Sequence, residues 1–315
     1  MADSNEPQWE RKVLERLAYA ALAEQKSRRR WGIFFKLLGF AYLTLVLLLL
    51  VDWGDSTDKL ADGKKHTAVV ELDGVISPDA QASAENITEA LQKAFKDKTT
   101  QGVVLRINSP GGSPVQSGRI NDEIGRLRAK YPSIPLYVVV EDMCASGGYY
   151  VAAAADQIYV DKASIVGSIG VLMDGFGFTG TMDKLGVERR LLTAGENKGF
   201  LDPFSPQDAK QLEHAKVLLE DVHKQFIEVV RKGRGKRLKE TPELFSGLMW
   251  TGDQAVQLGL ADGFGSVEYV AREVIKAEDI KDFTVKQSLA DRLARQFGAD
   301  VAESMAGAFA RLRLR

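Results

Sequence analysis

A single serine, Ser146, stands where an apolar segment gives way to glycines and alanines, in "EDMCASGGYYVAAAAD" (residues 141–156). If a strand turns into a helix here, the serine lies at a helix N-terminus, where free N–H groups and the helix dipole favour negative charge. Ser146 could then be a nucleophile, with the Gly147 N–H placed to bind an oxyanion. Alternatively, Ser146 could only cap the helix, as serine often does. Its neighbours alone leave both interpretations open.

A second glycine-bearing segment is "INSPGGSP" (residues 107–114). Pro110, Gly111 and Gly112 predict a tight turn whose N–H groups can point into a pocket. An ordinary β-turn is the alternative. Because this segment and Ser146 follow successive predicted strands, together they could form a two-sided oxyanion hole, in which one donor contributes about 3–4 kcal/mol.

A serine nucleophile needs a base. His214 and His223 lie in a predicted polar-faced helix, and we expect both to be solvated. Lys198, in "LLTAGENKGFLDPFSP" after a predicted strand, is the other candidate. A lysine acts as a base only where burial brings the pKa of its amine down from about 10.4 to nearly 7 or 8. An exposed, charged lysine is the alternative.

The elements that must position these residues follow an α/β rhythm. Nearly continuous apolar runs, "AVVELDGVI", "GVVLRIN" and "LYVVVED", predict strands buried on both faces. Helical spacing of apolar residues in "NITEALQKAF" and "VQSGRINDEIGRLRAK" predicts the connecting helices. The sequence therefore predicts a wound α/β fold whose site lies at the carboxyl ends of the strands.

A long apolar stretch precedes this domain. Residues 31–52 carry no charge except at Lys36 and Asp52 and are bracketed by tryptophans, which predicts one transmembrane helix. The basic run "KSRRR" before the span and the aspartates after it predict a cytoplasmic N-terminal segment (1–30) and an exported remainder. A linker (53–66), a catalytic domain (67–280) and an amphipathic tail (281–315) complete the predicted organisation.

Composition excludes several classes of protein. The net charge of -1 gives no reason to expect nucleic-acid binding, and one cysteine cannot form an internal disulfide. The three histidines show no metal-ligand spacing and no phosphate-binding loop of the ATPase type is present, so we expect no metal and no cofactor. The basic run "RKGRGKRLK" (231–239) is expected to be a solvated loop, with contact to acidic phospholipid as the alternative.

Five segments in fixed order, "INSPGGSP", "ASGGYYVAAAAD", "IVGSIGV", "TAGENKGFLDPFSP" and "TGDQAVQLGLADGFG", resemble the short form of the signal peptide peptidase family. The resemblance covers residues 66–275 and implies a membrane-bound serine–lysine protease of the ClpP/crotonase fold. It implies that Ser146 is the nucleophile and Lys198 the general base, that Gly147, Gly111 and Gly112 occupy oxyanion-hole positions, and that Ser168 orients the lysine.

The resemblance also implies a function and a location. We expect an ATP-independent endopeptidase of the bacterial inner membrane that degrades remnant signal peptides and other extended peptides outside the cytoplasm. Proteases of this fold usually form rings or domes, so we expect a homo-oligomer in contact with membrane lipid. A crotonase-like acyl-CoA enzyme and a catalytically silent membrane scaffold are the alternatives.

Overall fold

The computed structural model describes residues 6–50 and 63–285 of the chain. The chain forms two compact units. The larger, Ala61–Lys286, contains the sheet described below. In the other unit, α1 (Glu6–Leu50) is one uninterrupted helix. Among the described residues, no helix combines the length and the apolar character needed to cross a bilayer. The span predicted over 31–52 runs past the last described residue of α1 and is not confirmed.

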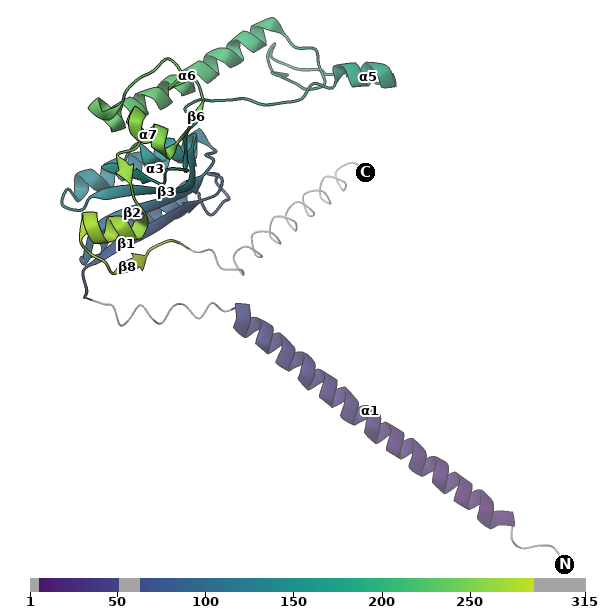
Figure 1. The fold of residues 1–315 in the computed structure, drawn as a ribbon. Helices are drawn as coiled ribbons and strands as arrows, with labels where there is room; N and C mark the ends of the chain where they lie inside the picture. Colours follow the sequence, from purple (N-terminus) through teal and green to yellow (C-terminus); the bar gives the residue numbers. More distant parts are fainter. Residues whose placement is uncertain (1–5, 51–62, 286–315) are drawn as a thin grey trace, which may run out of the picture. The chain divides into compact units, whose positions relative to one another are not determined.

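The larger unit is built on one sheet of eight strands in the order β6-β5-β3-β2-β1-β8, with β4 beside β3 and β7 beside β4 (Figure 1). The pairings are parallel except between β5 and β6. The α/β prediction is therefore confirmed. The strands are β1 (His66–Asp73), β2 (Thr100–Ser109), β3 (Leu136–Ala145), β4 (Gln157–Val160), β5 (Ile165–Gly167), β6 (Met249–Thr251), β7 (Gly263–Phe264) and β8 (Ile280–Asp282).

The helices cover both faces of this sheet. On one face the main core lies beneath helices that include α2 (Ala84–Lys96), α3 (Pro114–Lys130), α4 (Gly147–Ala152) and α6 (Ala209–Arg234). On the other, Val267 and Val270 pack against a row of valines from β1, β2 and β3. The sequence shows why α2 forms: Ser83 accepts a hydrogen bond from the Asn86 N–H as N-cap, and the predicted apolar face is buried. The remaining helices are α5 (Thr179–Leu185), η2 (Gly235–Arg237), α7 (Gly252–Leu258), α8 (Val267–Tyr269) and η3 (Val270–Ile275).

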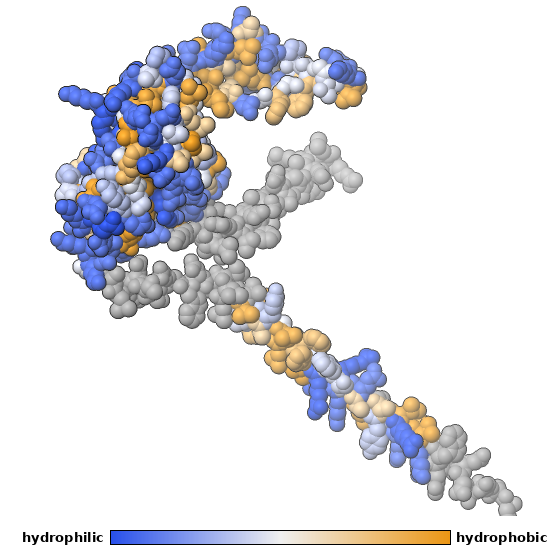
Figure 2. All heavy atoms as spheres, viewed as in Figure 1, coloured by the Kyte–Doolittle hydropathy of each residue, from blue (hydrophilic) through white to orange (hydrophobic). Residues whose placement is uncertain are grey.

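Residues 173–208, here called the arm, leave the body of the unit between β5 and α6. Figure 1 shows the arm carrying α5 away from the sheet, and Figure 2 shows apolar side chains along it. Its exposed apolar residues include Leu192, which is 96% exposed, and also Met173, Phe176, Phe178, Leu185, Val187, Leu191 and Phe204. The strand predicted before Lys198 is not formed, because residues 187–193 lie on the arm without a neighbouring strand.

The C-terminal edge of the unit lies beyond the predicted boundary at residue 280. Strand β8 pairs with β1, and the Phe283 N–H donates to the carbonyl oxygen of Val69 at 2.8 Å. Val285 packs against the main core. Five described residues of the predicted tail, 281–285, therefore belong to the compact unit, and the rest of the predicted tail (286–315) lies outside the described residues.

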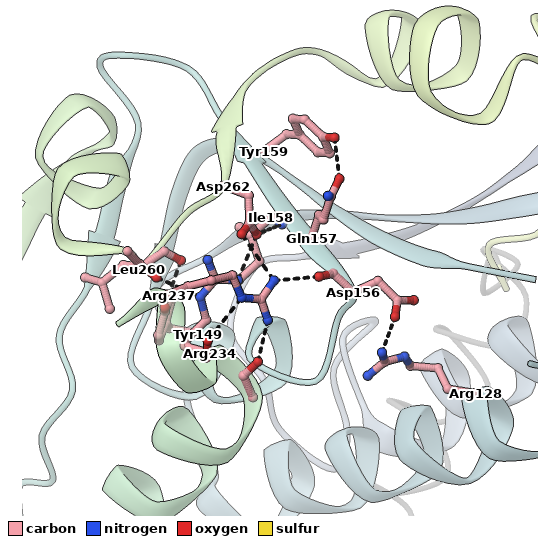
Figure 3. Close-up of polar contacts among 12 residues, drawn as sticks. Arg128, Tyr149, Asp156, Gln157, Ile158, Tyr159, Arg234, Arg237, Leu260 and Asp262 are labelled. Atoms are coloured by element: carbon pink, nitrogen blue, oxygen red, sulfur yellow. Dashed lines mark hydrogen bonds and ion pairs between the residues drawn. The ribbon is translucent and has the colours of Figure 1, made fainter. Parts of the chain in front are cut away.

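The basic run 231–239 is not the predicted loop, because residues 231–234 end α6 and residues 235–237 form η2. Most of its basic side chains are exposed, as predicted, but Arg234 is buried. Arg234 is 1% exposed, donates from Nε to the Gly259 carbonyl oxygen and forms an ion pair with Asp262 at 2.8 Å (Figure 3). Arg237 contacts the other carboxylate oxygen of Asp262 at 3.1 Å. This network ties the C-terminal end of α6 to β7, and the buried Tyr149 hydroxyl, which donates to a nearby carbonyl oxygen, lies beside it.

Replacing Arg234 with methionine should lower the free energy of unfolding by about 3 kcal/mol, because it leaves a largely buried carboxylate without its main partner. Burial raises the pKa of Asp262, but hydrogen bonds from Arg234 and from the Ile158 N–H outweigh burial, so the pKa lies below its ordinary value. The stabilisation is therefore present above the unfolded-state pKa, about 4, and is lost as the pH falls through the lower folded-state value.

Urea unfolding at neutral pH and at low pH measures this effect. Arg231→Met is the matched control, since Arg231 lies on the same helix but pairs with Glu240 at the exposed surface. Loss of such an exposed pair should change stability by less than about 1 kcal/mol. Equal losses of unfolding free energy in the two variants would contradict a larger contribution from the buried Arg234–Asp262 pair.

Candidate active site

A cavity of about 540 Å³ opens at the carboxyl ends of β2, β3 and β5. It brings together four of the six predicted site residues: Gly112, Ser146, Gly147 and Ser168. The rest of its wall was not predicted, because only the folded chain brings these segments together. That wall comprises Pro114 and Ser117 of α3, Tyr150 of α4, Gly170, Val171 and Leu172 after β5, Val222, Gln225 and Phe226 of α6, and Ser246 and Gly247 before β6.

Ser146 lies at the junction of β3 and α4, as predicted, in an unusual backbone conformation. Its φ is 51° and its ψ is -122°, outside the regions that residues with a side chain normally adopt. Such a conformation costs about 1–3 kcal/mol and is typical of functional sites. The residue holds the N-cap position, yet its side chain makes no capping hydrogen bond. The helix-cap interpretation of Ser146 is therefore wrong, and the residue borders the cavity.

The peptide between Ser146 and Gly147 is fixed by the first turn of α4. The Ser146 carbonyl oxygen accepts from the Tyr150 N–H at 3.0 Å. Because N–H and C=O point in opposite directions from a trans peptide plane, the Gly147 N–H points away from the helix. A Cβ on Gly147 would lie 2.5 Å from the Ser117 Oγ, so a larger residue here would have to displace that side chain.

The turn after β2 is fixed in the same way. The Gly111 carbonyl oxygen accepts from the Ile76 N–H at 2.8 Å, so the Gly112 N–H of the same peptide plane points the opposite way. Gly112 lines the cavity, and its nitrogen lies 3.2 Å from the position that a Cβ of Gly147 would occupy. The Gly111 N–H is engaged by the Ser109 Oγ at 3.1 Å. Of the two glycines that the sequence could not separate, Gly112 is the one that lines the cavity, whereas the Gly111 N–H is engaged by Ser109.

Ser168 is brought beside Ser146 by a third fixed peptide. The Ser146 N–H donates to the Gly167 carbonyl oxygen, and the Ser168 N–H donates to the Leu248 carbonyl oxygen, both at 2.8 Å. The peptide between Gly167 and Ser168 is thus held from both sides. Ser168 also has a φ of 51°, so two serines with positive φ border one cavity.

Lys198 is not at this cavity. It lies exposed on the arm, where its N–H donates to the Gly195 carbonyl oxygen at 3.1 Å. Within one copy of the chain, the structure therefore places Ser146, Gly112 and Gly147 at one cavity but does not bring the predicted base to them.

The two histidines of α6 have different environments. His214 is exposed, as expected, and contacts the ring of Phe200. His223 was also predicted to be solvated, but it is half-buried and its Nε2 lies 3.1 Å from the Ile169 carbonyl oxygen. That contact joins α6 to the segment that carries Ser168, so His223 is tied to the wall of the site and does not contact Ser146.

The chain is similar in sequence to known peptidases. The model of peptidase family S49 matches residues 128–281, a range that includes Ser146, Gly147, Ser168 and Lys198. The chain is 33% identical over 241 residues to a putative signal peptide peptidase SppA of Enterococcus faecium, covering 72% of this chain and 69% of the relative. It is 30% identical over 249 residues to the probable protease SohB of Haemophilus influenzae, covering 78% and 68%.

A further similarity is to part of a larger protein. The chain is 46% identical over 204 residues to a protein of Brucella melitensis named Na(+)/H(+) antiporter NhaA. That match includes 63% of this chain and spans only 28% of the relative's length. The similarity therefore concerns one segment of that protein.

Proposed function

Because the chain belongs to peptidase family S49, the family of signal peptide peptidase-like proteases, we propose that it is a serine endopeptidase with Ser146 as its nucleophile. The family makes the protein a peptidase, and the observation that carries the serine mechanism is the geometry around Ser146. Its hydroxyl is not used as a helix cap, its φ is positive, and Gly112 and Gly147 border the same cavity with their N–H groups directed away from carbonyl oxygens that are already hydrogen-bonded.

The chemistry follows from these groups. The Ser146 Oγ attacks the carbonyl carbon of the substrate peptide bond, and the Gly112 and Gly147 N–H groups bind the oxyanion that forms. Lys198 takes the serine proton and passes it to the leaving amine, which generates an acyl-enzyme. Water, activated by the same amine, then attacks the ester and releases Ser146. In this scheme Ser168 positions the lysine ammonium.

The remote position of Lys198 supports a homo-oligomeric enzyme in which a second copy supplies the base. The arm that carries Lys198 exposes a series of large apolar side chains, which monomeric proteins rarely leave uncovered as a patch. Residues 187–193 also lack the strand neighbour that the sequence pattern requires. We infer that the arm of one copy packs on the next and delivers Lys198 to the neighbouring cavity.

The substrates we propose are extended peptides, with remnant signal peptides as the main class. No ATPase motif is present in the sequence, and opening a stable domain costs about 5–15 kcal/mol, so folded proteins should resist cleavage. The apolar residues 37–51, with basic residues before them and acidic residues after, support anchoring in the inner membrane with the peptidase domain outside the cytoplasm. Anchoring would raise the concentration of membrane-derived peptides at the site.

A fluorophosphonate probe tests the proposed serine chemistry. Attack by the Ser146 Oγ on phosphorus with loss of fluoride should label one serine, which mass spectrometry should place in the peptide that contains Ser146. The Ser146→Ala variant should remain unlabelled, and Ser164→Ala, which removes another serine hydroxyl from a loop after a strand, should label normally. A folded wild-type protein that is not labelled would favour the acyl-CoA enzyme or the silent scaffold.

A further inference from the structure

The loop after β1 lies next to the candidate active site, and no motif of the sequence marks it. It does not contribute a group to the cavity, but it runs beside the turn that carries Gly112. Four hydrogen bonds join the two segments: Gly74 N–H to the Asn108 carbonyl oxygen (2.9 Å), Ser109 Oγ–H to the Gly74 carbonyl oxygen (2.6 Å), Ile76 N–H to the Gly111 carbonyl oxygen (2.8 Å) and Ser113 N–H to the Ile76 carbonyl oxygen (2.8 Å).

Ser109 is the side chain at the centre of this arrangement. It is the last residue of β2, is fully buried, and uses its hydroxyl in both directions. The Oγ–H donates to the Gly74 carbonyl oxygen, while the Oγ accepts from the Gly111 N–H at 3.1 Å. The Ser109 hydroxyl therefore links the β1 loop to the turn. It also accepts the hydrogen bond of the Gly111 N–H, which leaves that of Gly112 as the other glycine N–H of the turn.

Engaging the Gly111 N–H has a consequence for the neighbouring donor. With that group occupied, and with the next peptide plane held through Ile76, the turn cannot rotate to exchange the roles of Gly111 and Gly112. Without the hydroxyl, the Gly111 N–H would be buried without a partner, a loss that favours rotation of the turn. A small rotation would change the direction of the Gly112 N–H, and an oxyanion donor is effective only within hydrogen-bonding distance of the developing charge.

We infer that Ser109 is a positioning residue of the oxyanion hole, which selects the Gly112 N–H as the donor by holding the Gly111 N–H and the β1 loop together. The inference rests on the proposed function. This role of Ser109 differs from a purely structural one. It stabilises the transition state, in which the substrate carbonyl oxygen carries negative charge, and affects substrate binding much less.

Ser109→Ala should lower kcat by about 10- to 100-fold with KM nearly unchanged, less than the loss of about 10²–10³ seen when an oxyanion donor is removed outright. The affinities of two matched inhibitors distinguish a loss of oxyanion binding from a general loss of protein stability. The peptide aldehyde acetyl-Ala-Ala-leucinal adds the Ser146 Oγ to its carbonyl carbon and places an oxygen in the oxyanion hole, whereas the corresponding alcohol cannot. The inhibition constant of the aldehyde should rise by the same factor as kcat falls, and that of the alcohol should stay constant.

Thr67→Val is the control, because the Thr67 hydroxyl is also buried and donates to one carbonyl oxygen, that of Ala277, but at the opposite end of β1. It should retain kcat and aldehyde affinity. If Ser109→Ala does not fold, Ser109→Cys decides, since a thiol of similar size is a weak hydrogen-bonding group and should give an intermediate loss. Folded Ser109 variants with wild-type kcat and aldehyde affinity would overturn the inference. A wild-type protein that neither cleaves peptides nor binds the aldehyde would instead contradict the proposed function.

Discussion

Mixing two inactive variants, Ser146→Ala and Lys198→Ala, should restore peptide cleavage. Each variant alone should fall by at least about 10⁴-fold in kcat, because nucleophile and base act as a unit. In a mixed assembly, the arm of a Ser146→Ala copy brings an intact Lys198 to the intact Ser146 of a Lys198→Ala copy. If subunits associate at random in equal amounts around a ring, about one site in four is complete.

To measure this restoration, the two variants are co-expressed with different affinity tags and purified through both tags. The mixed oligomers are then assayed on a synthetic signal peptide. The control pairs Lys198→Ala with the double variant Ser146→Ala/Lys198→Ala, which supplies intact serines but no intact lysine and should stay inactive. Correctly assembled mixed oligomers without activity would show that the base does not come from a neighbouring copy. A monomer with full wild-type activity would contradict the oligomer itself.

Gly111→Ala should reduce kcat by at least about 10²-fold, although Gly111 donates no hydrogen bond to the substrate in the proposed scheme. Its φ is 99°, which strains any residue with a side chain. A Cβ at this position would lie 2.6 Å from the Gly147 nitrogen and 2.8 Å from the Ser146 Cβ. The substitution therefore pushes apart the nucleophile and both oxyanion donors.

Gly118→Ala is the matched control for that substitution. Gly118 lies on α3 just after the same turn, has no atom near the position of a new Cβ, and should gain slightly in helix stability. Steady-state kinetics on a signal peptide, with thermal unfolding of both variants, separates an effect on the site from one on the fold. Similar kcat values in the two glycine variants would show that the turn is not part of the active site.

Much of the fold could be predicted from the sequence, because buried parallel strands leave a strong signal. The apolar runs of β1, β2 and β3 are nearly continuous, and the helices between them have clear apolar faces. The strand predicted before Lys198 failed for a physical reason. Its residues have a strand-like composition, but a strand needs a neighbour, and a single copy offers none on the arm.

Part of the candidate site could also be predicted from the sequence, and part of it could not. Ser146 could be found because its position between an apolar strand and small residues is a local pattern. The choice between Gly111 and Gly112 could not, since it depends on the Ile76 N–H, which donates to the Gly111 carbonyl oxygen from another loop, and on the Ser109 Oγ, which accepts from the Gly111 N–H. The burial of Arg234 within a run of basic residues was also hidden, because its partner Asp262 lies 28 positions away.

The adjacency of β1 and β8 has an architectural consequence for how this domain can be joined to other chains. Thr67 and Ile280 pair directly, so the domain begins and ends on neighbouring strands at the edge opposite β6. A domain whose two ends lie close together can be inserted in or appended to another polypeptide without stretching either one. Such a fusion would enter and leave through β1 and β8, while Ser146 lies on the far side of β2, beyond the strands that the junction would disturb. The fold is thus suited to occur as a domain fused to, or inserted in, other proteins.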